Sequence, residues 1–240
     1  MIVRDAGDSW QVVLQIDHAD LSGAFARAWS EQGPRHASLE VAAGRHDDGW
    51  AVWERAPRVD AESGRPVNFL DVDVRSHLAF YRACIAAVGE QDAYAGLLVS
   101  MHGAGIYRQR YGRDPALGLS RAAEAQELVD AFVAEQESGY GARMESAGAT
   151  EDERWRDYAL LQIYDRLSLH FCMRDAENGE AAEFQDYEIE PLGAWRIRLR
   201  PFPFGDAPAQ FSLLRRVIPK GEPRDLLAIP AERVQITISD

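Results

Sequence analysis

Three apolar stripes at helical spacing in this sequence each contain one histidine or aspartate. Residues three or four apart lie on one face of a helix, and an apolar face packs against the core. His18, His77 and Asp165 are therefore predicted to point inward. A buried carboxylate without a partner is costly, so Asp165 needs a compensating group. The stripes are Leu14, His18, Leu21, Phe25 and Ala28; His77, Tyr81, Ile85 and Val88; and Tyr158, Leu161, Asp165, Leu169 and Cys172.

Two further segments carry histidines that could reach the same core. His46 and Asp47 follow a helical segment that Gly49 is expected to end. Adjacent residues do not share a helical face, but at a helix terminus both side chains can converge on one ion. His102 falls on a face with Leu98 in the run AYAGLLVSMHGAGIY. We predict a helix for this run, and a strand leading to a loop is the alternative.

The inward polar residues have two explanations. A single histidine on an apolar face is most often a hydrogen-bonded core residue, and a lone buried aspartate is often paired with an arginine. Here several such residues fall in one core, and each would need its own compensation, whereas one metal centre would satisfy them together. Imidazole and carboxylate are ordinary ligands of Fe, Mn and Zn. We therefore predict one or two divalent transition-metal ions, with the ligands His18, His46, Asp47, His77, His102 and Asp165.

Charge and hydropathy argue against several classes of protein. The net charge of -13 opposes nucleic-acid binding, because phosphate backbones require surplus cations. No apolar run approaches the roughly 20 residues of a membrane span, and the start MIVRDAGDSW lacks the features of an export signal. The two cysteines, Cys84 and Cys172, suit a reducing compartment. We expect a cytoplasmic protein that acts on a small-molecule substrate and binds neither nucleic acid nor membranes.

The elements that must position these residues are mainly helical. Helical periodicity begins near residue 14, and the last helix starts with a capping box at Thr150 and Glu153. MIVR and WQVVLQ are typical of a hairpin, and WRIRLRPFPF, QFSLLRRVIP and RVQITISD are typical of strands. We predict a mainly α fold with a small antiparallel sheet formed by the C-terminal strands and the N-terminal hairpin. It would form a single domain, 1–240, with a helical body at 14–174 and a β-rich appendage at 1–13 and 180–240.

In this order, the polar residues resemble those of the HD superfamily, the metal-dependent phosphohydrolases. That superfamily has a histidine on an early helix, a His-Asp doublet and a late aspartate often followed by Arg-Leu. His18 and the doublet His46-Asp47 match the first two features, and Asp165 in LLQIYDRLSL matches the third. MIVR, QIDHADLSG, HDDGW and SMHG together also resemble a bacterial family described as a domain of unknown function, which implies no activity.

The HD resemblance implies an HD-like helical domain that hydrolyses a phosphate ester or a nucleotide-like small molecule with a metal-activated water. Its binuclear branch adds histidines that His77 and His102 match, and implies that Asp47 bridges two ions. His46 and Asp47 are then the catalytic residues. The doublet is followed by Asp-Gly-Trp, not by the usual apolar-Gly-Lys, so a lysine that relatives can aim at phosphate is missing. No GYP triplet is present, so cyclic-dinucleotide specificity is not carried over.

Substrate contacts and alternative activities complete the set of hypotheses. An individual arginine is more often a surface or salt-bridge residue than a substrate contact, but its guanidinium group can also bind an oxyanion of the substrate. A di-iron oxygenase on the same scaffold and a non-catalytic, metal-containing sensor are the alternatives to hydrolysis. The candidate substrate-binding residues are Arg45, Arg108, Arg113 and Arg166, with Asn68 in a long loop.

Overall fold

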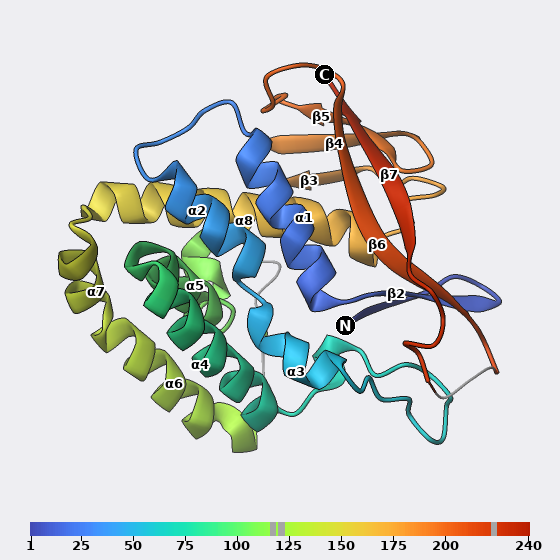
Figure 1. Ribbon diagram of the computed structural model, residues 1–240, viewed down its shortest axis with the longest axis horizontal. Helices are drawn as coiled ribbons and strands as arrows, with labels where there is room; N and C mark the ends of the chain where they lie inside the picture. The colour runs from blue at the N-terminus through green and yellow to red at the C-terminus, as the bar shows by residue number, and fades with distance from the viewer. Residues whose placement is uncertain (116–118, 120–122, 222–224) are drawn as a thin grey trace.

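The computed structural model describes residues 1–115, 119, 123–221 and 225–240. A layer of helices packs against one seven-stranded, curled half-barrel sheet (Figure 1). About 51% of the chain is helical and 20% is in strands, so the fold is mixed α/β. The prediction of a mainly α fold with a small sheet is therefore wrong. No helix among the described residues is both long and apolar enough to cross a membrane.

Eight α-helices form the helical layer of the described chain. The capping box predicted at Thr150 is confirmed: its side chain accepts a hydrogen bond from the Glu153 amide, and the Glu153 carboxylate accepts one from the Thr150 amide. The helix predicted around His102 is confirmed as well. The helices are α1 (Gln15–Ala28), α2 (His36–Arg45), α3 (Ala51–Glu54), α4 (Val74–Gln91), α5 (Ala93–Gly105), α6 (Gln126–Ser138), α7 (Tyr140–Ala147) and α8 (Glu151–Met173). Short 3-10 turns are η1 (Asp48–Trp50), η2 (Phe69–Asp71), η3 (Gln109–Gly112) and η5 (Ala123–Ala125).

The sheet joins the two ends of the chain. Its order is β1-β2-β6-β7-β5-β4-β3, so the N-terminal hairpin extends the C-terminal strands through β2 and β6. β5 and β7 run parallel, and the other neighbours are antiparallel. The N-terminal hairpin joins the sheet as predicted. β3 and β4 were not among the predicted strands, and β5 pairs with β7 in parallel, so the sheet is larger than predicted and not wholly antiparallel. The strands are β1 (Ile2–Asp5), β2 (Ser9–Val13), β3 (Ala182–Phe184), β4 (Tyr187–Gly193), β5 (Arg196–Arg200), β6 (Ala209–Pro219) and β7 (Glu232–Ser239).

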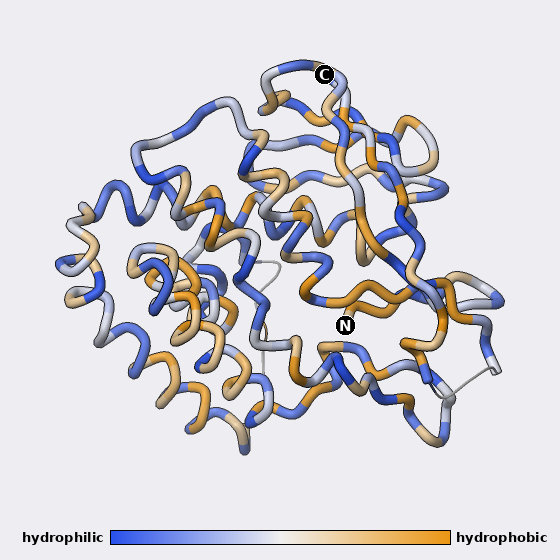
Figure 2. Tube along the Cα trace, in the orientation of Figure 1, coloured by the Kyte–Doolittle hydropathy of each residue, from blue (hydrophilic) through white to orange (hydrophobic). Residues whose placement is uncertain are grey.

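Two helices fix the centre of the molecule. α5 is apolar around its circumference and is buried from Tyr94 to Gly105 (Figure 2), as expected for a helix surrounded by protein. α1 lies between α8 and the sheet, with the Phe25 ring 4.7 Å from Phe211 and 6.4 Å from Phe171. The core therefore lies where helices and sheet meet.

A pair of glycines lets α1 and α2 approach closely. A Cβ atom on Gly23 would lie 2.7 Å from the Cα atom of Gly44, a distance that real side chains do not tolerate. Because these glycines have no side chains, the backbones of the two helices are in direct contact. The middle of α1 is thereby held beside the C-terminal end of α2, where His46 follows.

Candidate metal centre

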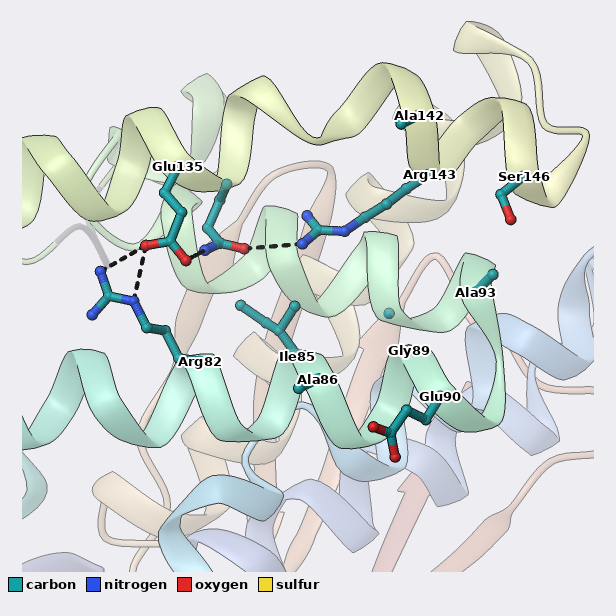
Figure 3. Close-up of a pocket in the computed structure, with 12 residues that line it drawn as sticks. Arg82, Ile85, Ala86, Gly89, Glu90, Ala93, Glu135, Ala142, Arg143 and Ser146 are labelled. Carbon is teal, nitrogen blue, oxygen red and sulfur yellow. Dashed lines mark hydrogen bonds and ion pairs between the residues drawn. The ribbon is translucent and has the colours of Figure 1, made fainter.

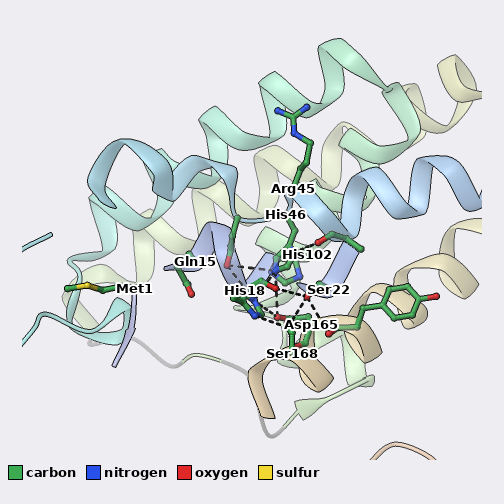
Figure 4. A network of polar contacts seen from close by, with 12 residues as sticks. Met1, Gln15, His18, Ser22, Arg45, His46, His102, Asp165 and Ser168 are labelled. Atoms are coloured by element: carbon green, nitrogen blue, oxygen red, sulfur yellow. Dashed lines mark hydrogen bonds and ion pairs between the residues drawn. The ribbon is translucent and has the colours of Figure 1, made fainter. Parts of the chain in front are cut away.

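Four segments of the chain bring histidines and aspartates to one buried point (Figure 4). α1 supplies His18, the end of α2 supplies His46 and Asp47, α5 supplies His102, and α8 supplies Asp165. Each of the five is at most 4% exposed. The inward orientation that helical spacing predicts for His18 and Asp165 is therefore confirmed.

The facing atoms of these residues lie at distances suited to one ion. His18 Nε2 is 3.2 Å from His46 Nε2 and 3.1 Å from Asp165 Oδ1, and His46 Nε2 is 3.6 Å from the same oxygen. Two ligands about 2.0–2.2 Å from a common ion are about 2.8–3.6 Å apart. Asp47 Oδ2 is slightly further, at 3.9 Å from His18 Nε2 and 3.7 Å from His46 Nε2. His18, His46 and Asp165 could thus hold a metal with little movement.

The outward nitrogens of the two histidines already have partners. His46 Nδ1 lies 2.8 Å from the Ala43 carbonyl oxygen, and His18 Nδ1 lies 2.7 Å from Ser168 Oγ. Ser168 Oγ is in turn 2.8 Å from Ser22 Oγ. A neutral His46 that donates from Nδ1 leaves the Nε2 lone pair free, directed at the other ligands. Such partners commonly orient metal-binding histidines.

His102 and His77 have different positions in this site. His46, Asp47 and His102 form a second group whose ligand atoms lie within 4.8 Å of one another. Because both groups contain His46, and its Nδ1 is engaged by Ala43, they cannot bind separate ions at the same time. His77 is buried as predicted but belongs to neither group; its Nδ1 lies 2.5 Å from the Tyr107 hydroxyl oxygen.

A cavity of about 240 Å³ opens beside the histidines and aspartates. This volume is below the roughly 300–1,000 Å³ of sites for drug-sized ligands, so a small substrate fits best. His77 lines the cavity together with His18, Asp47, His102 and Asp165, and its other walls combine further polar groups with apolar side chains such as Ile106 and Leu169. We call it the central cavity.

A larger groove of about 600 Å³ lies elsewhere, between α4, α6 and α7 (Figure 3). No residue of the two ligand groups lines it. Its arginines have partners: Arg82 pairs with Glu135, and Arg143 donates to Gln136. The central cavity is therefore the better candidate for a reaction site.

Arg110 is a member of the site that periodicity did not reveal. It is only 6% exposed, and its Nη1 atom lies 2.8 Å from Asp165 Oδ2, 2.7 Å from Gln162 Oε1 and 3.3 Å from His102 Nδ1. η3 turns left-handed here, with φ angles of 51° at Gln109, 53° at Arg110 and 50° at Tyr111. Non-glycine residues in this conformation cost about 1–3 kcal/mol each and persist where their surroundings impose it.

The buried charges compensate one another in the absence of an ion. Burial opposes ionisation of Asp165, but Arg110 and the histidines outweigh it and hold the pKa of Asp165 well below its usual range. Burial also opposes protonation of His46, but Asp47 and Asp165 outweigh it and raise the pKa of His46 to about 9. Burial, helped by His46 and Arg110, lowers the pKa of His102 well below its usual range. Before binding an ion, His46 is therefore protonated and His102 is neutral.

Comparison with known proteins gives a family but no activity. Residues 1–220 match the family model described as a protein of unknown function, DUF3891. The chain belongs to the DUF3891 family. No curated protein and no solved structure matches it. The predicted resemblance to a family of unknown function is thus confirmed. The comparisons add nothing to the HD resemblance of this DUF3891 protein, which depends on the order of its histidines and aspartates in the sequence.

The predicted substrate-binding residues of the DUF3891 protein lie outside the central cavity. Arg45 points away from the metal centre in Figure 4 and pairs with Asp48. Arg108 is half-exposed and pairs with Glu137. Asn68 caps η2 by accepting a hydrogen bond from the Leu70 amide, and Arg113 is exposed.

Arg166 is the substrate-binding candidate nearest to the centre. It follows Asp165 on α8, and its Nε atom lies 3.6 Å from Asp114 Oδ2. It lines a second hollow that shares two wall residues with the central cavity. Among the described arginines, Arg110 is the one that lines the central cavity.

Proposed function

We propose that this protein is a metal-dependent hydrolase of HD type that acts on a phosphate ester or a nucleotide-like small molecule. The observation that carries the proposal is the triangle of His18 Nε2, His46 Nε2 and Asp165 Oδ1, with sides of 3.2, 3.1 and 3.6 Å. Asp47 would provide the fourth protein ligand and His102 a further one. Fe, Mn and Zn all accept this combination of imidazole and carboxylate.

The principal alternative is a hydrogen-bonded core network that needs no ion. Arg110 and a protonated His46 do balance the charges of Asp47 and Asp165. In that network the protonated Nε2 atom of His46 donates a hydrogen bond to the Nε2 lone pair of His18 at 3.2 Å. Once His46 loses this proton, both Nε2 lone pairs can bind one ion while Ala43 and Ser168 hold the Nδ1 atoms. The same arrangement of the rings therefore serves both states, and metal analysis distinguishes them.

When bound, a metal ion would lower the pKa of a coordinated water and polarise a phosphoryl oxygen. The chain's own groups supply orientation and charge. Tyr81 donates a hydrogen bond to Asp47 Oδ1 at 2.9 Å. Burial and Asp47 raise the pKa of Tyr81 well above its usual value, so this donor keeps its proton at neutral pH.

Arg110 would act on the substrate side of the proposed site. Its Nη1 atom is held by Asp165 and Gln162, while its side chain also lines the central cavity. A guanidinium group binds phosphate oxygens well because it presents several donors in one plane. Arg110 would therefore take the role of the lysine that is missing after the His-Asp doublet.

Metal analysis tests the proposal most directly. Protein purified without chelator should contain about one equivalent of a transition metal, and His46→Ala should lose it. His36→Ala is the matched control, because His36 begins α2, the helix that His46 follows, and lies in neither ligand group. Less than about half an equivalent in the wild type would contradict the proposal.

Activity of the metal-loaded protein would then be measured with phosphomonoesters, phosphodiesters and nucleotides. Hydrolysis should depend on metal and disappear in His46→Ala while His36→Ala retains it. Metal binding without hydrolysis of any of these esters would reject the phosphohydrolase activity and leave the metal centre in place.

A mononuclear non-haem iron oxygenase is the second candidate, favoured by one observation. His18, His46 and Asp165 have the two-histidine, one-carboxylate composition of non-haem iron oxygenases. Oxygen consumption by the ferrous protein, absent from the zinc-loaded protein, would support this candidate over hydrolysis.

A further inference from the structure

A second hollow adjoins the central cavity along α8. Its volume is about 330 Å³, and it lies between α8 and β3. Leu169 and Met173 line both spaces, so the two adjoin at these apolar side chains. We call this hollow the α8–β3 pocket; its polar walls are Arg166, His170, Arg174 and Glu180.

The α8–β3 pocket has a surplus of positive charge. Arg174 pairs with Glu180 at 2.7 Å, which neutralises one of its two guanidinium groups. Arg166 forms a longer salt bridge with Asp114, at 3.6 Å, and Asp114 does not line the pocket. The Arg166 guanidinium also lies 6.0 Å from the centre of the Phe184 ring, which helps to hold it at the wall. The walls therefore carry two positive charges and one negative charge.

His170 adds an unsatisfied polar group to the same pocket. It is only 7% exposed, and among the described residues its Nδ1 atom has no hydrogen-bond partner. A buried polar atom without a partner costs about 1–3 kcal/mol and in a native protein calls for an explanation. Burial, followed by Arg174 and Arg166, lowers the pKa of His170 to about 4, and these effects outweigh the opposing effect of Glu180.

The surface between the two spaces is apolar and accessible. Met173 is 38% exposed, and Leu70, at the wall of the central cavity, is 43% exposed; both belong to the small set of exposed large hydrophobic residues. Exposed apolar residues beside a pocket with polar groups are typical of a ligand site. A ligand that reaches from one space to the other would cover them.

We propose that the α8–β3 pocket is an oxyanion subsite for the distal phosphate or carboxylate group of the substrate. Resting on the proposed function, this inference defines the substrate class: a small molecule with its reacting group in the central cavity, an apolar middle against Leu169 and Met173, and a second acidic group at Arg166, His170 and Arg174. The incoming anion would contact the Arg166 guanidinium, whose acidic partner Asp114 lies outside the pocket, and accept a hydrogen bond from His170.

The test follows the imidazole signals of the full chain, with isotope-labelled histidine, during titration with inorganic phosphate and separately with acetate. The protein has six histidines, so His170 can be assigned by comparison with His170→Gln. Binding in the pocket should shift the His170 signal and raise its pKa by about one unit. The response to phosphate and to acetate identifies which oxyanion the pocket prefers.

Matched arginine variants make the test specific. Arg174→Gln should weaken binding about tenfold, because it removes one guanidinium group from the wall and leaves the Glu180 carboxylate unpaired beside the anion. Arg82→Gln is the control, since Arg82 is 44% exposed and paired with Glu135, as Arg174 is 42% exposed and paired with Glu180. Equal affinities of the two variants would overturn the proposal.

Titrations with and without metal separate this inference from the proposed function. A His170 response in both forms supports the subsite, even if the protein binds no metal. A response confined to His77 or His102, or no response at up to about 100 mM of either anion, overturns the subsite even if metal-dependent hydrolysis is found.

Discussion

His18 Nε2 and His46 Nε2 face each other at 3.2 Å although 28 positions separate the two residues in the sequence. The contact depends on backbone packing between α1 and α2, where Gly23 meets Gly44. The distance between the two histidine nitrogens, which suits a metal ion, thus depends on two glycines. This relationship links stability to metal binding and leads to the first prediction.

Gly23→Ala should force α1 and α2 apart, because its Cβ atom would lie 2.7 Å from the Gly44 Cα atom. We expect a loss of about 1–3 kcal/mol in the free energy of unfolding, the usual cost of overpacking. Metal affinity should fall as well, since His18 and His46 would separate. Urea denaturation and metal titration measure the two effects.

Gly141→Ala is the control for that variant. Gly141 lies in α7, and its Cβ atom would meet nothing within 4 Å. Replacement of a helical glycine by alanine should stabilise the protein by up to about 1 kcal/mol. If both variants behave alike, close packing of α1 on α2 does not control the site.

Tyr81→Phe should weaken metal binding about 10–100-fold, the usual effect of removing a partner of a metal ligand. Its hydroxyl group donates to Asp47 Oδ1 at 2.9 Å and orients this carboxylate. Tyr94→Phe removes a hydrogen bond of the same length, to Asp157, outside both ligand groups. Each variant should lose about 1 kcal/mol of stability, and only Tyr81→Phe should change the metal affinity.

Metal binding should release about one proton at about pH 7.5, because His46 is protonated in the metal-free protein and must lose that proton to bind an ion. The pKa of about 9 at His46 implies that affinity increases with pH up to that value. Calorimetry in buffers with different ionisation enthalpies counts the protons. Uptake of metal without proton release would show that His46 is already neutral.

The same raised pKa predicts how stability of the metal-free protein varies with pH. Because the folded-state pKa of His46 lies above its usual value of 6.5, its contribution is fully present below pH 6.5 and is lost as the pH rises through about 9. Unfolding measured over this range should show a decline that His46→Gln lacks. A parallel decline in both proteins would assign the effect to other groups.

Arg110→Gln should destabilise the metal-free protein by about 3–5 kcal/mol, because it removes a partner of the buried Asp165 carboxylate. Metal should raise the melting temperature of this variant more than that of the wild type, since an ion supplies the missing positive charge. Arg108→Gln, two positions away and half-exposed, should change stability by no more than about 0.5 kcal/mol. Equal effects of metal on wild type and Arg110→Gln would separate Arg110 from the site.

The sequence by itself determined the faces of the helices. His18, Asp165 and His77 lie on stripes with a spacing of three or four residues, and all three are buried as that spacing predicts. The capping box at Thr150 was equally local. Such features depend on neighbours within a turn or two of helix, so a single sequence contains the information.

Only the tertiary structure decided which buried residues meet. It placed His18, His46 and Asp165 around one point, whereas His77, equally buried, turned its Nδ1 atom to Tyr107. It also paired β5 with β7 in parallel and added β3 and β4 at one edge, so that the sheet is larger than the predicted strands alone would form. Arg110 entered the site on a left-handed turn that no periodicity describes. These outcomes depend on contacts between distant segments and on backbone conformations imposed by packing, and neither leaves a repeating pattern in the sequence.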